Sequence, residues 1–224
     1  MRLSIIVPAL EESACITATL AALQPLRAHG HEVIVVDGGS RDATLLIARL
    51  LADRAFVAAP GRAAQMNAGA RAAAGDVLLF LHADSLLPAD AAGAIERALA
   101  GGAVWGRFDI NLGGRARVLK LVAAMMNLRS RLTGIATGDQ GIFVTRAAFE
   151  TAGGFAPIPL MEDIALSRTM KRVAGRPACL ATRIETSGRR WDAQGPWRTI
   201  FRMWGLRLAY ALGADPVRLA RHYR

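Results

Sequence analysis

Three continuous apolar runs, separated by helix-like segments, constrain the fold of this chain more than any other feature. They are LSIIVP at 3–8, EVIVVD at 32–37 and DVLLFL at 76–81. A run that is apolar at nearly every position predicts a strand buried on both faces, as in parallel sheets. The alternation of strands and helices with short connections therefore predicts an α/β fold with a mostly parallel central sheet flanked by helices.

Local signals predict the other elements of the first half. A weaker strand is expected at 55–59, and Gly75 is expected to end the helix before the third run. Ser40 or Asp42 is expected to cap the second helix, and Pro88 suits the first position of the fourth. The helices are predicted at 13–28, 40–53, 61–75 and 88–100.

The second half of the sequence alternates less regularly. Its predicted strands lie at 102–112 and at the start of 141–155, and its predicted helices at 115–132, 161–175, 198–213 and after Asp215-Pro216. The helices at 115–132 and 198–213 are basic and amphipathic. Because no internal repeat or domain boundary interrupts the pattern, a single domain is predicted over 1–224.

The composition narrows the choice of partners. The chain has 28 basic and 18 acidic residues, a formal net charge of +10, and much of its Arg lies in 114–133 and 189–224. Such a balance suits nucleic acid, anionic lipid or phosphorylated small molecules, although Arg on solvated faces would also explain it. Basic residues interleaved with aromatics in an RNA-binding signature are missing, so nucleic acid is not expected.

Other features predict a cytoplasmic protein. No apolar run approaches the about 18 residues that a membrane-spanning helix needs. The N-terminal MRLSIIVPA reads as a first strand rather than a signal peptide. Cys15 and Cys179 lie far apart and match no metal-binding spacing, which favours reduced, structural thiols.

Polar residues follow each of the three strong strands. Glu11-Glu12, Asp37 with its GGSRDAT turn, and His82-Ala83-Asp84 would meet at the carboxyl edge of the sheet, where ligands bind in such folds. Asp84 could give one oxygen to a divalent ion, whereas His82 suits Mn²⁺ better than Mg²⁺ or serves only a structural hydrogen bond. The alternative for each is an ordinary turn or cap without a ligand.

Three further motifs carry polar side chains at positions suited to binding. Gly138-Asp139-Gln140-Gly141 is either a binding loop or a plain connection into a strand. Glu162-Asp163 opens a helix, where carboxylates also serve as caps. Arg189-Arg190-Trp191 could hold a diphosphate through guanidinium groups, or stack an Arg on a surface Trp.

In their order, these motifs resemble those of the family 2 glycosyltransferases, inverting enzymes of the GT-A fold. The matching stretches are SIIVPALEE, VIVVDGGSRDAT, GDVLLFLHAD, GDQGIFVTR, GGF, MEDIALSRTMKR and SGRRW. GRAAQMNAGARAAAGDVLLFLHAD and IPLMEDIALSRTMKR are similar to a narrower subgroup, the radical-SAM/selenodomain-associated transferase 2 or arsenosugar-biosynthesis type. The resemblance covers nearly the whole chain.

The resemblance implies a nucleotide-binding half at 1–100 and an acceptor-binding half at 101–224, which ends in the basic amphipathic helices. Asp163 would be the general base, and Asp84 would bind Mn²⁺ or Mg²⁺, with His82 as a second candidate metal ligand. The donor would contact Pro8, Ala9, Glu12, Asp37, Arg62, Arg190 and Trp191. The acceptor would contact Asp139, Gln140 and Glu162.

The implied activity is transfer of a sugar, with inversion, from a UDP- or GDP-type sugar donor to an unidentified acceptor. The sequence departs from the family at His82, where an Asp is usual, and at Glu11-Glu12, where Asn-Glu is usual. The Arg-Trp element lacks its usual Gln, so processive synthesis is not expected. The alternatives are a nucleotidyltransferase of similar fold and a degenerate GT-A domain that acts as a binding module at the inner membrane face.

Overall fold

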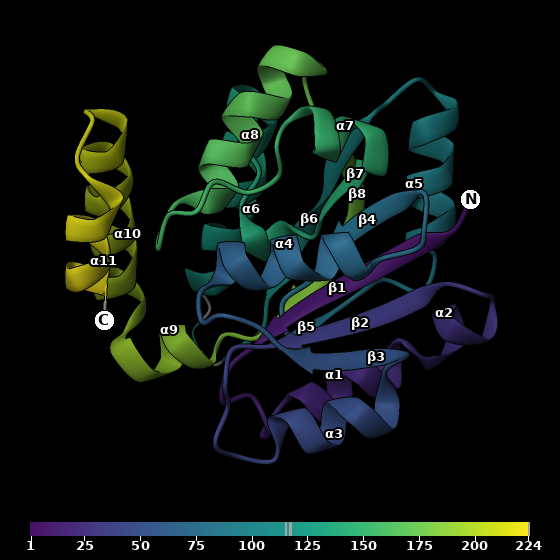
Figure 1. Cartoon of the computed structure of the whole chain (residues 1–224). Helices are drawn as coiled ribbons and strands as arrows, with labels where there is room; N and C mark the ends of the chain where they lie inside the picture. Colours follow the sequence, from purple (N-terminus) through teal and green to yellow (C-terminus); the bar gives the residue numbers. More distant parts are fainter. Residues whose placement is uncertain (115, 117, 224) are drawn as a thin grey trace.

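The computed structural model describes residues 1–114, 116 and 118–223, apart from the side chains at 190, 193 and 194. Within this part of the chain, eight strands form one sheet in the order β3-β2-β1-β4-β7-β6-β8-β5 (Figure 1). The strands are β1 Leu3–Ala9, β2 Glu32–Asp37, β3 Arg54–Val57, β4 Val77–Phe80, β5 Ser85–Leu86, β6 Trp105–Leu112, β7 Ile142–Thr145 and β8 Ala178–Thr186.

Helices cover both faces of this sheet, and the last three lie at one end of it (Figure 1). They are α1 Ile16–Ala22, α2 Gln24–Ala28, α3 Thr44–Leu51, α4 Arg62–Ala72, α5 Ala91–Ala100, α6 Val118–Thr133, α7 Arg146–Thr151, α8 Glu162–Val173, α9 Arg189–Gln194, α10 Pro196–Ala211 and α11 Pro216–Tyr223. A short 3₁₀ helix, η1 Gly138–Gln140, precedes β7. Within the described residues, no helix is both long and apolar enough to cross a membrane.

The three apolar runs form the centre of the sheet, as their composition predicts. β1 pairs in parallel with both β2 and β4, and all of its residues except Pro8 are buried. Alternate side chains enter two separate cores, because successive residues of a strand point to opposite faces. Ile5 packs with α1, α3 and α5, whereas Ile6 packs with α4, α7 and α8.

The predicted α/β class is confirmed, and the sheet is parallel in its first half. β7 and β5 introduce the antiparallel pairings, while β6 and β8 are parallel to one another. β8 was not predicted from the sequence, because its exposed polar residues hide the apolar pattern. Arg183 and Glu185 are exposed, and of its residues only Ile184 and Thr186 are buried.

Several predicted helix ends are wrong by a few residues. The helix predicted at 13–28 is two helices, α1 and α2, since Pro25 begins a new one. Neither Ser40 nor Asp42 is the N-cap of α3, which is Ala43. The Ser40 hydroxyl donates to Asp37, and Asp42 lies one residue before the N-cap and accepts the Thr44 N–H. Pro88 lies outside α5, whose first residue, Ala91, hydrogen-bonds to the Pro88 carbonyl.

Candidate functional site

A cavity of about 580 Å³ opens beyond the carboxyl ends of β1, β4, β6 and β8. Its polar wall contains Glu12, Arg62, His82, Asp84, Asp139, Glu162, Asp163 and Arg189. Its apolar wall contains Leu112, Val122, Met126, Leu160, Trp191, Ile200, Met203 and Trp204. Strand ends therefore supply much of the charge, and the helices of the second half supply most of the apolar surface.

One end of the cavity holds a cluster of Glu12, Asp84 and Arg189. The Nη2 atom of Arg189 lies 2.9 Å from Oε2 of Glu12 and 3.6 Å from Oδ2 of Asp84. Burial and the negative charge of Glu12 raise the pKa of Asp84, and Arg189 opposes them. The nearby Cys15 thiol donates to Glu12 at 3.0 Å, and burial with this contact raises its pKa to about 12. A thiol with this pKa stays protonated near neutral pH, which fits the structural role predicted for Cys15.

His82 lies between this cluster and the η1 loop. Its Nε2 atom is buried and has no hydrogen-bond partner among the described residues. Burial and the charge of Arg62 lower its pKa to about 3, so the imidazole is neutral at physiological pH. Gly138 allows this close approach, since a Cβ there would lie 2.7 Å from the His82 Nε2.

The donor set fits a metal only if a substrate completes the coordination. No group of three or more His, Cys, Asp and Glu gathers around a common point within the described residues. Asp84 offers a carboxylate at the cavity and His82 an unpartnered nitrogen. Mg²⁺ and similar ions in phosphate-transfer sites are commonly held by one or two carboxylates together with substrate phosphates. Asp84 satisfies this minimum.

Asp163 is fixed at the start of α8 by two backbone N–H groups. Gly138 N–H donates to its Oδ2 at 2.9 Å, and Ile164 N–H donates to its Oδ1 at 2.7 Å. Met161, just before α8, has a left-handed φ of 69°, an unusual conformation for a residue other than Gly. The carboxylate thus joins α8 to the η1 loop and keeps lone pairs available toward the cavity.

Glu162, the neighbour of Asp163, is in a different environment. It is only 4% exposed, and Arg62 Nη1 lies 3.9 Å from its Oε1. Burial and the charge of Asp163 raise its pKa to about 7, against the opposing effect of Arg62. The pair therefore combines a fixed carboxylate with a carboxyl group that titrates near neutral pH.

Three predicted site residues do not line the cavity, namely Ala9, Asp37 and Gln140. Both oxygens of Asp37 are bound within its own turn, by the N–H groups of Gly39 and Ser40 and by the Ser40 hydroxyl. Gln140 is buried and caps η1 through Thr137. The side chain of Arg190 lies outside the described residues. The other predicted residues, from Pro8 to Trp191, do line the cavity.

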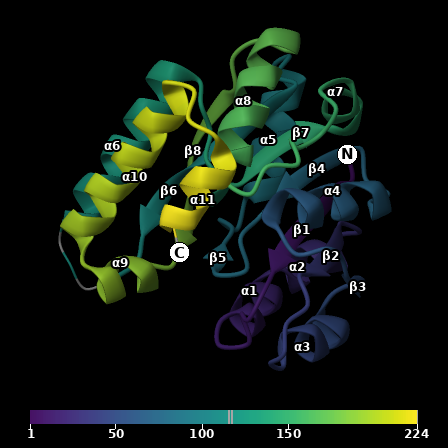
Figure 2. The ribbon, with the colours of Figure 1, turned by 60° about the vertical axis from the view of Figure 1, so that its left-hand side comes forward.

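Sequence reasoning missed three arginines near the cavity. Arg189 lies in the Arg-Trp motif, in which the resemblance implies its neighbour Arg190 as the donor contact. Arg129 on α6 and Arg207 on α10 lie in ordinary basic helices, and no sequence motif distinguishes them. Only the packing of α9 and α10 against α6, through Trp191 and Ile200, brings these helices together (Figure 2).

The family model that describes glycosyl transferase family 2 matches residues 4–146. The chain belongs to glycosyl transferase family 2. This confirms the predicted family and makes the chain a glycosyltransferase domain, whereas the narrower subgroup stays a prediction. A search of curated proteins gave no match.

Solved structures of GT-A glycosyltransferases share the fold at low sequence identity, which confirms the predicted GT-A architecture. S. aureus TarS 1-349 in complex with UDP-GlcNAc has a TM-score of 0.66 and 20% identity, over 84% of this chain and 58% of that one. A mannosyltransferase from Pyrobaculum calidifontis, in complex with GDP-Man and Mn²⁺, has a TM-score of 0.63 and 22% identity, over 92% and 60%. Glucosyl-3-phosphoglycerate synthase from Mycobacterium tuberculosis has a TM-score of 0.62 and 22% identity, over 82% and 70%. The chain spans only 40 to 66% of the three TarS chains that it matches.

Proposed function

We propose that this glycosyltransferase domain moves a sugar from a nucleoside diphosphate sugar to an acceptor hydroxyl, with inversion. The observation that carries the proposal is one cavity that joins the fixed carboxylate of Asp163 to the Glu12, Asp84 and Arg189 cluster. Relatives of the same fold were solved with UDP-GlcNAc and with GDP-Man, which supports a donor of this class.

Asp163 is the proposed general base. The acceptor oxygen attacks the anomeric carbon, its proton passes to the Asp163 carboxylate, and the bond from that carbon to the diphosphate oxygen breaks. Two backbone N–H groups hold the carboxylate in place, so little reorganisation is needed when the proton arrives.

The departing diphosphate is proposed to lie at the Asp84 end of the cavity. Arg189 can donate to phosphate oxygens there, and its half-exposed side chain is free to exchange Glu12 for a ligand. Asp84, with His82 as the second candidate, would hold Mn²⁺ or Mg²⁺. When bound, such an ion stabilises the leaving diphosphate as a Lewis acid.

Titration calorimetry of UDP and GDP, with and without Mn²⁺, tests the donor site. We expect binding of one nucleotide that is strengthened by Mn²⁺, and loss of that strengthening in Asp84→Ala. Glu96→Ala, at an exposed position of α5, is the matched control and should bind like the wild type. Binding of neither nucleotide would contradict the proposal and favour a degenerate domain.

Product analysis separates sugar transfer from the alternative, nucleotidyl transfer. Sugar transfer releases free nucleoside diphosphate from a nucleotide sugar. Formation of a nucleotide sugar from a nucleoside triphosphate releases pyrophosphate. Detection of pyrophosphate, and not nucleoside diphosphate, would overturn the proposed reaction.

The solvent-exposed face of α10 supports peripheral docking on an anionic membrane surface. For a cytoplasmic protein, this would be the inner face of the membrane. Its exposed apolar residues recur at helical spacing and are Trp197, Phe201 and Leu208, followed by the C-cap Leu212. The half-exposed Trp204 lies where this face meets the cavity. Leu121, Met125, Leu128 and Leu132 form a similar exposed row on α6. Neither helix contains Asp or Glu, and both carry Arg. Apolar residues with aromatic anchors and purely basic charge are typical of interfacial helices.

Vesicle co-sedimentation tests this docking. Leu208→Glu with Leu212→Glu should abolish binding to vesicles of phosphatidylglycerol and phosphatidylcholine. Leu46→Glu with Leu50→Glu on α3 is matched in residue type, spacing and exposure (63% and 75%, against 63% and 80%) and should bind normally. No vesicle binding by the wild type at low salt would contradict membrane docking. A wild-type dimer that is lost in the α10 variant would instead assign this face to a protein contact.

A further inference from the structure

Arg129 of α6 and Arg207 of α10 are half-buried residues with guanidinium nitrogens that are buried and have no hydrogen-bond partner among the described residues. The Nε and Nη2 atoms of Arg129 and the Nε of Arg207 are buried and have no hydrogen-bond partner among the described residues. A buried charged donor left without a partner costs free energy, so such groups are rare in folded proteins. These two arginines require an explanation other than stability.

The two guanidinium groups also repel one another. Burial lowers the pKa of Arg129 to about 10, and the positive charge of Arg207 contributes to this lowering. Arg129 is still protonated at neutral pH. Two like charges from different helices, close enough to affect one another and each with a buried nitrogen that has no partner, would both stabilise an anion placed between them.

The arginines lie near the proposed base and not near the proposed diphosphate site. Arg207 lines the cavity together with Asp139 and Asp163. These two carboxylates are also the negative charges that act on Arg129, whereas those of Glu12 and Asp84 are not among its principal influences. Neither carboxylate neutralises the pair through a direct bond, since Asp163 accepts backbone N–H groups and the Asp139 Oδ1 has no partner.

We infer that Arg129 and Arg207 bind an anionic group, a phosphate or a carboxylate, carried by the acceptor. The assignment to the acceptor rests on the proposed function, in which Asp163 takes the acceptor's proton beside this pair. Met126 of α6 and Met203 of α10 also line the cavity, so the same two helices offer apolar surface to the rest of the molecule. An acceptor with a negative charge close to the reacting hydroxyl fits this arrangement.

Calorimetric titration of the intact chain with inorganic phosphate and with phenyl phosphate tests the pair. We expect binding that is about 10-fold weaker in Arg129→Gln and in Arg207→Gln, as for loss of a hydrogen bond to a charged group. Arg198→Gln removes the same charge from an exposed position of α10 and should leave the affinity unchanged. Equal affinity in the wild type and all three variants would overturn the inference.

A second titration, at saturating UDP or GDP with Mn²⁺, separates acceptor from donor. Phosphate should still bind when the nucleotide is bound. Competition between them would assign the arginines to the donor's diphosphate and overturn the acceptor assignment. If neither nucleotide binds, the proposed function fails. The phosphate affinities of the wild type and the arginine variants without nucleotide would still test the anion site.

Vesicles distinguish the two sources of the phosphate. If the acceptor's phosphate is a lipid head group, vesicles of phosphatidic acid in phosphatidylcholine should displace inorganic phosphate from the wild type. If the acceptor is a small soluble molecule, those vesicles should leave phosphate binding unchanged. Both outcomes support the anion site, provided that the arginine variants weaken phosphate binding.

Thermal unfolding with and without phosphate distinguishes an anion-binding role of Arg129 from a purely structural one. Arg129→Met keeps an unbranched apolar stem and removes the repulsion with Arg207. Its Tm should equal or exceed that of the wild type without phosphate, and phosphate should raise the Tm of the wild type only. A Tm that falls equally with and without phosphate would show that Arg129 is a structural residue.

Discussion

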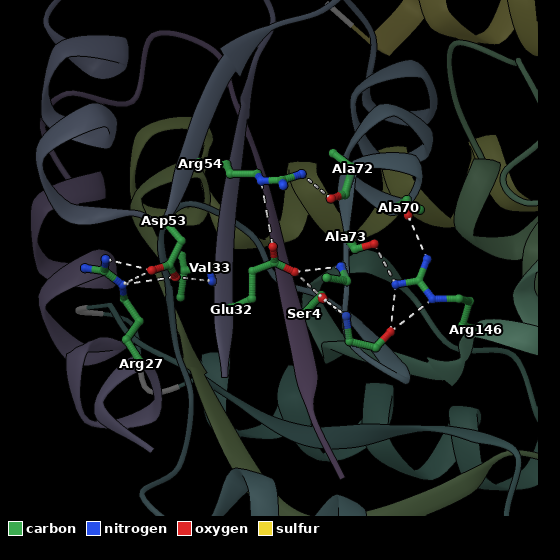
Figure 3. A network of polar contacts seen from close by, with 12 residues as sticks. Ser4, Arg27, Glu32, Val33, Asp53, Arg54, Ala70, Ala72, Ala73 and Arg146 are labelled. Carbon is green, nitrogen blue, oxygen red and sulfur yellow. Dashed lines mark hydrogen bonds and ion pairs between the residues drawn. The ribbon is translucent and has the colours of Figure 1, made fainter. Parts of the chain in front are cut away.

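The two edges of the sheet differ in whether their buried polar groups have hydrogen-bond partners. At the amino edge, near the starts of β1, β2 and β4, each such group has partners (Figure 3). Glu32 Oε2 accepts the Ser4 hydroxyl at 2.7 Å and the Ala74 N–H at 2.8 Å. The same Ser4 oxygen accepts the Gly75 N–H at 2.8 Å.

Arg146 completes this amino-edge network. Its guanidinium donates to the backbone carbonyls of Ala70, Ala73 and Gly75, which follow or end α4 (Figure 3). The charged group therefore closes the end of a helix whose last carbonyls would otherwise lack donors. The hydrogen bonds at this edge therefore stabilise the fold.

The carboxyl edge retains groups without partners instead. His82 Nε2 and Asp139 Oδ1 are buried and unbonded among the described residues. Arg207 lines the same cavity, and the charges of Arg207 and Asp163 act on Arg129. Because each costs stability, their concentration at one edge indicates that a ligand supplies what the protein does not. In this protein, buried polar groups without hydrogen-bond partners therefore indicate the position of the candidate site better than the distribution of charge does.

The largest expected effect at the carboxyl edge comes from Asp163→Asn. Asn keeps an oxygen that can accept the Gly138 N–H but cannot take up the acceptor's proton, so the rate of transfer should fall by ~10²–10⁴-fold. The measurement is the transfer rate with the donor identified by calorimetry, with nucleotide affinity as the control. An Asn variant of full activity would remove Asp163 as the base and point to Glu162.

At the amino edge, Glu32→Ala should destabilise the fold and leave the donor site intact. It leaves the Ser4 hydroxyl and the Ala74 N–H without their acceptor, which should lower the free energy of unfolding by about 2–4 kcal/mol. Urea unfolding measures this effect, and Glu96→Ala at an exposed position is the control. A stability equal to that of the wild type would break the contrast between the two edges.

The smallest expected effect is a pH dependence of stability from Glu162. Its pKa is raised in the folded state from 4.5 to about 7, so the folded chain binds more protons and stability falls as pH rises through this window. Glu162→Gln should remove the loss, and its Tm should exceed that of the wild type more at pH 7 than at pH 5. A constant difference between the two proteins would contradict the shift.

His82 acts in the opposite direction and must be separated from Glu162. Its pKa is lowered from 6.5 to about 3, so the unfolded chain binds more protons between these values and stability falls as pH drops below 6.5. The two effects overlap in the acidic part of the Glu162 window. Measuring Glu162→Gln and His82→Asn against the wild type at each pH resolves them.

Much of the fold was readable from the sequence because it depends on local patterns. The apolar runs of β1, β2 and β4 and the helices between them follow from burial on both faces and from helical spacing. β8 was missed, because its exposed Arg183 and Glu185 interrupt the apolar pattern and its pairing partner, β6, lies far away in the sequence. Strand pairing over such distances is a property of the tertiary structure.

The sequence alone determined which carboxylates follow strands and which open a helix, and so it identified Glu12, Asp84 and Asp163 as cavity residues. It could not show that Asp37 is used up by its own turn, because that depends on the orientation of a side chain. Nor could it show that Arg129 and Arg207 meet near one cavity. Their residue types are ordinary for basic helices, and only the packing of α10 against α6 decides that both lose water without gaining a partner.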